Sequence, residues 1–226
     1  MKIKFGAIVV AGSGKIGGHV ASKNRGGAYL RTKVTPTNPN TSAQAEARAL
    51  LSSLSTAWSG LTESQRLGWN GAVKDFATTD IFGDIKNPSG INLYVKLNAN
   101  LLGTGQAGIS DAPAKIEIPF SPLASAVYDV STPASTGFTF AGSEMIDTAI
   151  LVSATPKVSN GTSFVKNLYR NIGTVNGDEG LLTFGDDYIA KFGNLTVGDK
   201  IFLKVEAVLA NGQKGTAQTI SIVAVA

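Results

Sequence analysis

Residues 200–208 read Lys-Ile-Phe-Leu-Lys-Val-Glu-Ala-Val, and every odd-numbered position in this stretch is apolar. An apolar residue at every second position is typical of a strand that turns one face to a core. The pair Asn211-Gly212 follows, a strong hairpin signal, and residues 219–225 supply a returning strand. These residues predict antiparallel β structure in the last part of the chain.

The same two-residue period extends upstream to about Pro113. Two further Asn-Gly pairs, at 160–161 and 176–177, mark additional turns. The other predicted strands are 116–120, 138–140, 149–153, 164–169 and 181–184. About seven short strands, with turns at intervals of about ten residues, favour an antiparallel β-sandwich over residues 113–226.

Residues 41–112 carry the helical period instead. The first predicted helix begins after the capping candidates Asn40 and Thr41 and ends at Gly60. Its apolar stripe consists of Ala47, Leu50, Leu51, Leu54 and Trp58. Helices of three or four turns are marginal alone in water, so we expect them to pack on one another or on a neighbour.

Two more helices are predicted in the same region. Thr62 and Gln65 match a capping box, and the helix that they open has Trp69, Val73 and Phe76 on its inner face. Ser89 caps the third helix and Gly103 ends it. Its inward residues are Ile91, Tyr94, Val95, Leu101 and Leu102. We expect the two tryptophans, Trp58 and Trp69, to form the core of this helical unit.

Residues 1–40 are punctuated by glycine and proline, with short β-prone pieces at 3–10 and 28–34. Pro36 and Pro39 push the residues before them into extended conformations. The sequence therefore predicts an extended arm or a hairpin. The whole chain is predicted to be α+β, with a basic arm at 1–40, a helical docking unit at 41–112 and a sandwich at 113–226.

Charge is distributed unevenly along the chain. Residues 1–45 hold seven of the 20 Lys and Arg and none of the 16 Asp and Glu, so this segment carries +7 and the remainder carries −3. The seven basic residues are Lys2, Lys4, Lys15, Lys23, Arg25, Arg31 and Lys33. Such a segment predicts binding to nucleic acid or to an acidic protein surface, with ordinary solubility as the alternative.

The composition excludes several classes of protein. With 43% hydrophobic residues the chain can bury a substantial core. The absence of cysteine excludes disulfide frameworks, thiolate zinc sites and thiol nucleophiles. No apolar run approaches the ~20 residues of a membrane span, and the run at 7–11 is too short for a signal-peptide core. We therefore expect no membrane partner and no secretion signal.

Residues 12–17 read Gly-Ser-Gly-Lys-Ile-Gly, which matches the glycine pattern of dinucleotide sites. Such a site requires a helix next, but Arg25, Gly26 and Gly27 interrupt the chain within ten residues. The carboxylate expected about 20 residues on is also absent, because the first acidic residue is Glu46. The segment is therefore predicted to bind no nucleotide, and no cofactor is expected.

No catalytic or metal-binding constellation is found. His19 is the only histidine and lies in the arm, so a histidine triad or zinc site has little to build on. The acidic pairs Asp186-Asp187 and Asp178-Glu179 lie in predicted loops that lack the further oxygen ligands calcium needs. We expect a protein that is not an enzyme.

Four segments carry an ordered pattern. They are Gly-Lys-Ile-Gly at 14–17, Arg-Thr-Lys-Val-x-Pro-x-Asn-Pro-x-Thr-x-x-Gln at 31–44, Leu-Thr-x-x-Gln-Arg-x-x-Trp at 61–69 and Ser-Gly-x-Asn-Leu-Tyr-x-x-Leu-Asn at 89–98. Their order and spacing resemble those of phage-encoded virion proteins, over about residues 12–113. The resemblance implies a structural component of a particle.

Residues 195–207 read Leu-x-Val-Gly-Asp-Lys-Ile-x-Leu-x-Val-x-Ala. This stretch resembles the start of the F strand in fibronectin type III and immunoglobulin-like domains, which phage structural proteins often carry. Ile201 stands where that family has its corner tyrosine, so a related sandwich is an equal alternative.

The leading hypothesis is a bacteriophage virion protein of the head, decoration or neck. Residues 1–112 would dock on capsid, portal or neck proteins, copies would associate in the particle, and the sandwich would project or bridge. The predicted interaction residues are Lys15, Lys23, Arg25, Tyr29, Arg31 and Lys33. Two alternatives stay open: nucleic-acid contact through the arm, and host-surface or glycan binding by the sandwich, with Tyr128 and Tyr188 as the candidate rings.

Overall fold

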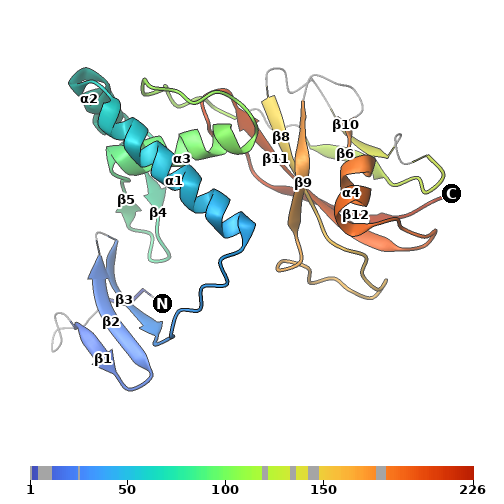
Figure 1. Cartoon of the computed structure of the whole chain (residues 1–226), viewed down its shortest axis with the longest axis horizontal. Helices are drawn as coiled ribbons and strands as arrows, with labels where there is room; N and C mark the ends of the chain where they lie inside the picture. Colours follow the sequence, from blue (N-terminus) through green and yellow to red (C-terminus); the bar gives the residue numbers. More distant parts are fainter. Residues whose placement is uncertain are drawn as a thin grey trace.

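The computed structural model of the protein describes residues 2–4, 12–24, 26–118, 122–132, 136–141, 148–176 and 182–226. Within these residues the fold is mixed α+β, with helices and several antiparallel sheets, which confirms the predicted class. In Figure 1 the N-terminal strands lie below the helices, and the C-terminal strands lie to the right of both. The predicted domain boundaries at 40 and 112 stay a prediction.

The N-terminal region contains a three-stranded antiparallel sheet in the order β1-β2-β3. Its strands are β1 (Gly14–Ile16), β2 (His19–Asn24) and β3 (Gly27–Thr32). Gly17, in the β1–β2 turn, and Gly27, the first residue of β3, have φ of 55° and 103°, a region that favours glycine. Of the two predicted forms, extended arm and hairpin, the described residues adopt the second, with one strand more.

The three predicted helices are present and begin at the predicted residues, and the first and third also end as predicted. They are α1 (Ser42–Gly60), α2 (Glu63–Ala72) and α3 (Gly90–Gly103). The second is shorter than its predicted inner face, since Val73 and Phe76 lie beyond its last residue, Ala72. Thr41 caps α1, and Thr62 and Gln65 make both hydrogen bonds of a capping box on α2. Ser89 accepts from the backbone N–H of Asn92 at the start of α3. Local capping chemistry therefore places these helices correctly.

The helices share a core around Tyr94. Trp69 is fully buried, and its indole Nε1 donates to the Ser110 carbonyl at 2.8 Å. Its ring meets Tyr94 edge-on with centroids 5.2 Å apart, while Trp58 contacts the same tyrosine at 5.4 Å. The prediction that both tryptophans belong to the helical core is confirmed.

The predicted inner faces are wrong at three positions. Ala47, Leu51 and Leu102 are exposed. Because α1 packs along α3, one neighbouring helix covers only a narrow line of its surface, centred on Leu54. The buried leucines that the prediction omitted are Leu61, Leu93 and Leu97.

A short hairpin that the sequence did not predict lies between α2 and α3. Its strands are β4 (Thr78–Thr79) and β5 (Ile85–Lys86). The tip is exposed at Ile81, while the Asp80 side chain is only 4% exposed. This hairpin faces the N-terminal sheet (Figure 1).

Residues 122–226 contribute two antiparallel sheets. One has the order β10-β7-β6 and the other the order β12-β11-β8-β9. The strands are β6 (Leu123–Val127), β7 (Gly137–Phe140), β8 (Thr148–Ala154), β9 (Arg170–Asn176), β10 (Leu182–Thr183), β11 (Lys200–Leu209) and β12 (Gln218–Val223). Both sheets contribute to one hydrophobic core, which includes Phe138, Ile150 and Ile201, each with no exposed surface.

Two predicted strands are wrong. Residues 164–169 form no strand: 166–168 lie in a turn, closed by a 2.9 Å bond from the Leu168 N–H to the Val165 carbonyl, and the strand begins only at Arg170. Residues 116–118 belong to no strand, and 119–120 lie outside the described residues. Alternating apolar residues indicate an extended chain, but do not guarantee a neighbouring strand to pair with.

A fourth helix, α4 (Gly185–Phe192), occupies a stretch that was predicted to be a loop. Asp186 and Asp187 lie in its first turn and Lys191 in its last, an arrangement that suits the helix dipole. Tyr188, on the inner side of this helix, is fully buried, and its hydroxyl donates to the Thr155 carbonyl at 3.2 Å. The acidic pair is therefore a helix-start signal that the sequence reading missed.

The predicted turn at Asn211-Gly212 is confirmed and also contacts α3. Gly212 has φ of 79°, and a Cβ there would lie 2.5 Å from the Leu97 carbonyl oxygen. The Asn100 side chain donates to the Gly212 carbonyl at 2.8 Å. Gln213 binds both the N–H and the carbonyl of Ile116, at 2.7 and 3.1 Å. This turn thus joins the helices to the C-terminal strands.

Candidate interaction surface on the N-terminal sheet

Three of the six predicted interaction residues share one face of the N-terminal sheet. Lys15 lies opposite Val20, which lies opposite Arg31, so these side chains point to the same side. Tyr29 is two residues before Arg31 on β3 and therefore joins them. Lys15 and Arg31 are exposed and Tyr29 is half-buried. We call Lys15, Tyr29 and Arg31 the basic face.

The other three predicted residues are not part of the basic face. Lys23 follows Ser22, the partner of Tyr29, so its side chain points to the opposite side of the sheet. Lys33 lies just beyond β3, where its backbone N–H donates to the Gly18 carbonyl at 2.8 Å. Arg25 lies outside the described residues. The predicted residues thus surround the sheet instead of forming one patch.

No carboxylate neutralises these cations in the part of the chain that the structure describes. Lys15, Lys23, Arg31 and Lys33 are exposed and form no salt bridge there. Their own segment has no acidic residue, since the first one in the sequence is Glu46. The sheet therefore presents a positive field to solvent, which attracts anionic partners.

Lys2 and Lys4, unlike the cations of the sheet, form ion pairs with carboxylates of the same chain. Lys2 Nζ lies 3.5 Å from an Asp80 carboxylate oxygen, and Lys4 Nζ lies 3.0 Å from an Asp84 oxygen. Lys4 also sits over the Phe82 ring, 5.2 Å from its centroid. We call Asp80, Phe82 and Asp84 the acidic anchor.

Residues 2–4 also contact the N-terminal sheet through their backbone. Lys2 makes an isolated antiparallel bridge with Tyr29, and the Ile3 N–H donates to the Ala28 carbonyl at 3.0 Å. This short basic segment therefore lies between β3 and the acidic anchor. It ties the sheet to the β4–β5 hairpin.

Asp80 is held ionised by its surroundings. Burial alone would raise the pKa of this carboxyl, but four other contacts outweigh it. The backbone N–H groups of Phe82 and Asp84 donate to Oδ1 at 2.8 and 3.1 Å, and Lys2 and Lys86 supply positive charge. The pKa of Asp80 is lowered below its ordinary value, so the anchor keeps its charge at neutral pH.

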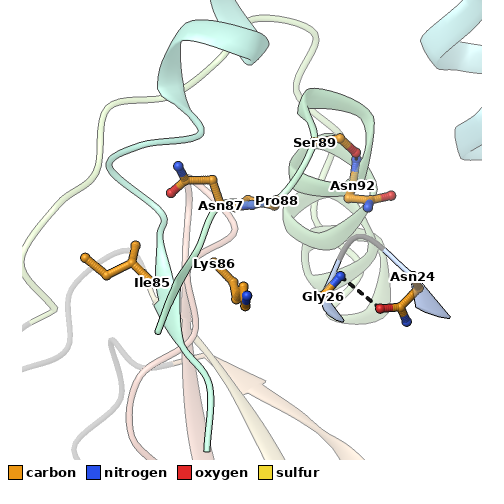
Figure 2. Close-up of a pocket in the computed structure, with 8 residues that line it drawn as sticks. All are labelled: Asn24, Gly26, Ile85, Lys86, Asn87, Pro88, Ser89 and Asn92. Atoms are coloured by element: carbon orange, nitrogen blue, oxygen red, sulfur yellow. Dashed lines mark hydrogen bonds between the residues drawn. The ribbon is translucent and has the colours of Figure 1, made fainter. Parts of the chain in front are cut away.

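The contact between sheet and helices is hollow beside the anchor. A cavity of about 580 Å³ lies between the β2–β3 turn and the start of α3. Figure 2 shows Asn24 and Gly26 opposite Ser89 and Asn92, with the 2.8 Å bond from the Gly26 N–H to Asn24 Oδ1. Lys86 also lines this space. Its lining is polar, so it adds little hydrophobic adhesion between the two parts.

Sequence reasoning missed the acidic anchor. It counted Lys2 and Lys4 among the cations of the basic segment and did not identify the turn that contains Asp80 and Asp84. A usable signal was Asp-Ile-Phe-Gly-Asp at 80–84, since an aspartate three residues before a glycine is typical of a tight turn. That pattern indicates a turn with two carboxylates, but it does not indicate which lysines reach them.

The residues considered for glycan binding are buried. Tyr188 has no exposed surface and Tyr128 is 1% exposed, so neither ring can stack on a sugar. Phe164, in the predicted strand 164–169, belongs to no strand and is 75% exposed. The choice of rings was therefore wrong, and among the described residues of 122–226 Phe164 is the most exposed aromatic side chain.

The glycine motif at 12–17 leads into a strand. Residues 14–16 form β1 and pair with β2, so no helix N-terminus stands behind the glycines, as the sequence predicts. His19 is exposed at the start of β2. Within the described ranges no group of three His, Asp or Glu side chains is arranged to hold a metal ion. Nor does any helix there have the length and apolarity to cross a membrane.

Comparison with known proteins gives no relative: no protein-family model, curated protein or solved structure matches the chain.

Proposed function

We propose that this protein is a structural component of a bacteriophage particle, of the head, decoration or neck, that docks on neighbouring particle proteins through its N-terminal sheet. Docking would bury surface and pair charges, without chemical conversion of a substrate. The partners would be acidic faces of capsid, portal or neck proteins. Two observations support the proposal: the four sequence segments between residues 12 and 113, whose order and spacing resemble those of virion proteins, and the geometry of the N-terminal sheet.

One observation carries the proposal. The sheet presents Lys15, Lys23, Arg31 and Lys33 to solvent, and within the described residues none of them has a carboxylate partner. The exposed segment 34–41 lies between these cations and the helices. A small charged sheet on an extended tether suits insertion into a neighbour better than it suits an independent globular role.

We further propose that residues 122–226 form a sandwich of the fibronectin type III kind. Two sheets of three and four strands around one core support this. In constant-type immunoglobulin domains the fourth strand joins the sheet of the first two. Here the fourth strand, β9, pairs with the third, β8, which favours the fibronectin arrangement. The projecting sandwich would cover or bridge neighbouring subunits.

Particle incorporation tests the proposal. Phage particles from a culture that encodes the chain are banded on a density gradient and analysed by mass spectrometry. We expect wild-type protein at a fixed ratio to the major shell protein, and a reduction of at least tenfold for the variant K15E/K23E/R31E/K33E. The matched control, K74E/K115E/K166E/K214E, reverses four exposed lysines outside the sheet that form no ion pair within the described residues, and it should be incorporated normally. Absence of the wild-type chain from the gradient band contradicts the proposal.

Nucleic-acid binding is a second candidate, favoured by the place of Tyr29. Its ring shares a face with Lys15 and Arg31, the combination that stacks a base and pairs with phosphates. Filter binding of single-stranded DNA at several salt concentrations tests it. This candidate requires an affinity that falls steeply with salt and a clear loss in Y29A. Salt-independent or undetectable retention removes it.

A further inference from the structure

The acidic anchor is a preformed receptor for a short basic strand. It offers two carboxylates and an aromatic ring to residues 2–4. The buried Asp80 carboxylate is fixed by two backbone N–H groups, so its position does not depend on the incoming lysine. The receptor therefore exists whether or not the segment is bound.

The side-chain contacts between the acidic anchor and residues 2–4 of the same chain are mainly ion pairs. Neither hydrophobic core contains a described residue before Leu50. Where the sheet approaches the hairpin and α3, ion pairs and a cavity of about 580 Å³ occur in place of packed apolar side chains. The Lys4–Asp84 pair, with side chains 59% and 44% exposed, is screened at physiological salt, whereas the Lys2–Asp80 pair, whose carboxylate is only 4% exposed, is screened less. A contact held by two such pairs, without apolar packing, opens more readily than a packed core does.

The connection between the sheet and the helices allows the sheet to leave. Residues 33–41 are exposed and belong to no helix or strand. Pro36 and Pro39 keep this segment extended. Nine extended residues span up to about 30 Å, enough to carry the sheet to an adjacent copy.

We propose that the N-terminal segment exchanges between copies of this chain: residues 2–4 of one copy bind the acidic anchor of a second copy. The exchanged contact is identical to the internal one, so exchange breaks no interaction that it does not restore. A second copy is the partner that the page supports best, because its anchor already fits this segment atom by atom. The inference rests on the proposed function and names one partner within it.

Mass action predicts that exchange occurs in the particle and not in dilute solution. The tether gives the internal contact an effective concentration in the millimolar range, so a dilute chain closes on itself. Copies held side by side in a particle reach comparable local concentrations, and exchange then links them into a chain of subunits. The test must therefore disable the internal contact without removing the exchanged one.

Two complementary variants do this. The first, K2E/K4E, carries an acidic segment and an unchanged anchor. The second, D80N/D84K, carries an unchanged segment and a reversed anchor, and the asparagine retains an oxygen for the N–H groups of Phe82 and Asp84. Neither variant can close internally, whereas each segment is complementary to the anchor of the other variant.

Sedimentation velocity on an equimolar mixture at about 100 μM, in low salt, measures the outcome. We expect each variant alone to sediment as a 23.3 kDa monomer, and the mixture to form a species of twice that mass that 0.5 M NaCl dissolves. The lighter pair K4E and D84K changes only side chains that are 59% and 44% exposed, and it should give the same species if the larger changes disturb folding.

The control mixture is K15E/K23E with D80N/D84K. K15E/K23E keeps both a basic segment and an acidic anchor, so the two close on each other within one chain at the millimolar effective concentration of the tether and outcompete the free basic segment of D80N/D84K. This mixture should therefore remain monomeric. If the complementary mixtures also remain monomeric, the anchor serves only its own chain and the inference is overturned. That result leaves incorporation of the wild-type chain into particles untouched, so the two proposals fail separately. Association of the control as strongly as the test pair also contradicts exchange.

Discussion

Asp80 illustrates how one side chain joins two parts of the molecule. Its carboxylate closes the turn of the β4–β5 hairpin by accepting from Phe82 and Asp84, and it also receives Lys2 from the N-terminal segment. A neutral residue would fill the same space but would lose the pairing with lysine. The charge of Asp80 is therefore the feature that links the hairpin to the segment.

Removing Lys2 should raise the pKa of Asp80. Burial raises this pKa, and the two N–H donors, Lys2 and Lys86 lower it further than burial raises it. In K2Q the pKa should move up, because burial is then opposed only by the two N–H donors and Lys86. Carboxyl NMR titration measures the shift, with K74Q as the control. An Asp80 pKa that is the same in wild type and K2Q would show that the ion pair does not form.

The lowered pKa also sets the sign of the pH dependence. A carboxyl whose folded-state pKa is depressed contributes stability that is complete above the ordinary pKa. We expect amide exchange in residues 80–84 to be constant from pH 7 to about pH 5, after correction for intrinsic exchange, and protection to fall as pH drops below about 4. Protection that instead increases on acidification would contradict the assignment.

Trp69 is the residue on which the helical core depends most. It is fully buried, contacts Tyr94 edge-on and donates to Ser110. Replacing it with alanine removes the ring and leaves the Ser110 carbonyl unpaired, so W69A should lose about 3–5 kcal/mol of unfolding free energy. Urea denaturation followed by far-UV circular dichroism measures this. L67A, at a 61% exposed position of the same helix, should change it by no more than ~0.5 kcal/mol.

At the scale of elements, local signals predicted the helices well. Thr41, Thr62 and Ser89 mark three helix starts by hydrogen bonds within three residues, so no knowledge of the remaining fold was needed. The strand at 200–208 was equally clear because every second residue is apolar. The helix caps and the alternating strand can each be recognised within a short stretch of sequence.

The elements that sequence reasoning missed depend on distant partners. Residues 116–118, predicted to be part of a strand, do not pair with one. The backbone N–H and carbonyl of Ile116 are bonded instead by the side chain of Gln213, 97 residues away. The acidic anchor forms only when residues 2–4 meet the turn at 80–84. Three of the six predicted interaction residues form the basic face because of the register of the strands. That register depends on where the turns before and after β2 fall.

The turn at Gly212 should prove to be a joint between the helices and the C-terminal strands. Both G212A and G193A place alanine at a positive φ, of 79° and 84°. Only at Gly212 would the new Cβ also collide with a neighbour, the Leu97 carbonyl of α3, whereas nothing lies within 4 Å at Gly193. We therefore expect G212A to increase proteolytic cleavage within 104–118 several-fold more than G193A does. Equal cleavage in the two variants would show that the turn does not brace α3.

At the scale of the whole molecule, charge and packing divide the chain in the same place. The first 45 residues carry +7 and the rest −3, and the described residues before Leu50 lie outside both hydrophobic cores. The body holds itself together by apolar burial, whereas the N-terminal sheet is attached by a few ion pairs and a tether. A protein with this division is suited to transfer its N-terminal sheet to a neighbour.

The attachment of the sheet should therefore depend on salt. We expect amide exchange of residues 19–24 and 27–32 to accelerate between 0.05 and 1 M NaCl, since screening weakens the pairs of Lys2 and Lys4. Exchange within α3 should be unaffected over the same range, because its buried leucines lie in the helical core and its described residues form no ion pair. If both regions respond alike, salt acts on global stability and the sheet is not separately attached.

Zero-length carbodiimide cross-linking of purified particles, read by mass spectrometry, tests the central idea most directly. It joins a lysine to a carboxylate only when the two are in contact. We predict cross-links from Lys15, Lys23 and Lys33 to carboxylates of other particle subunits. If these three lysines stay unlinked, or link only within their own chain, while Lys157 links normally to Asp199, 3.8 Å away, then the sheet does not dock on an acidic neighbour.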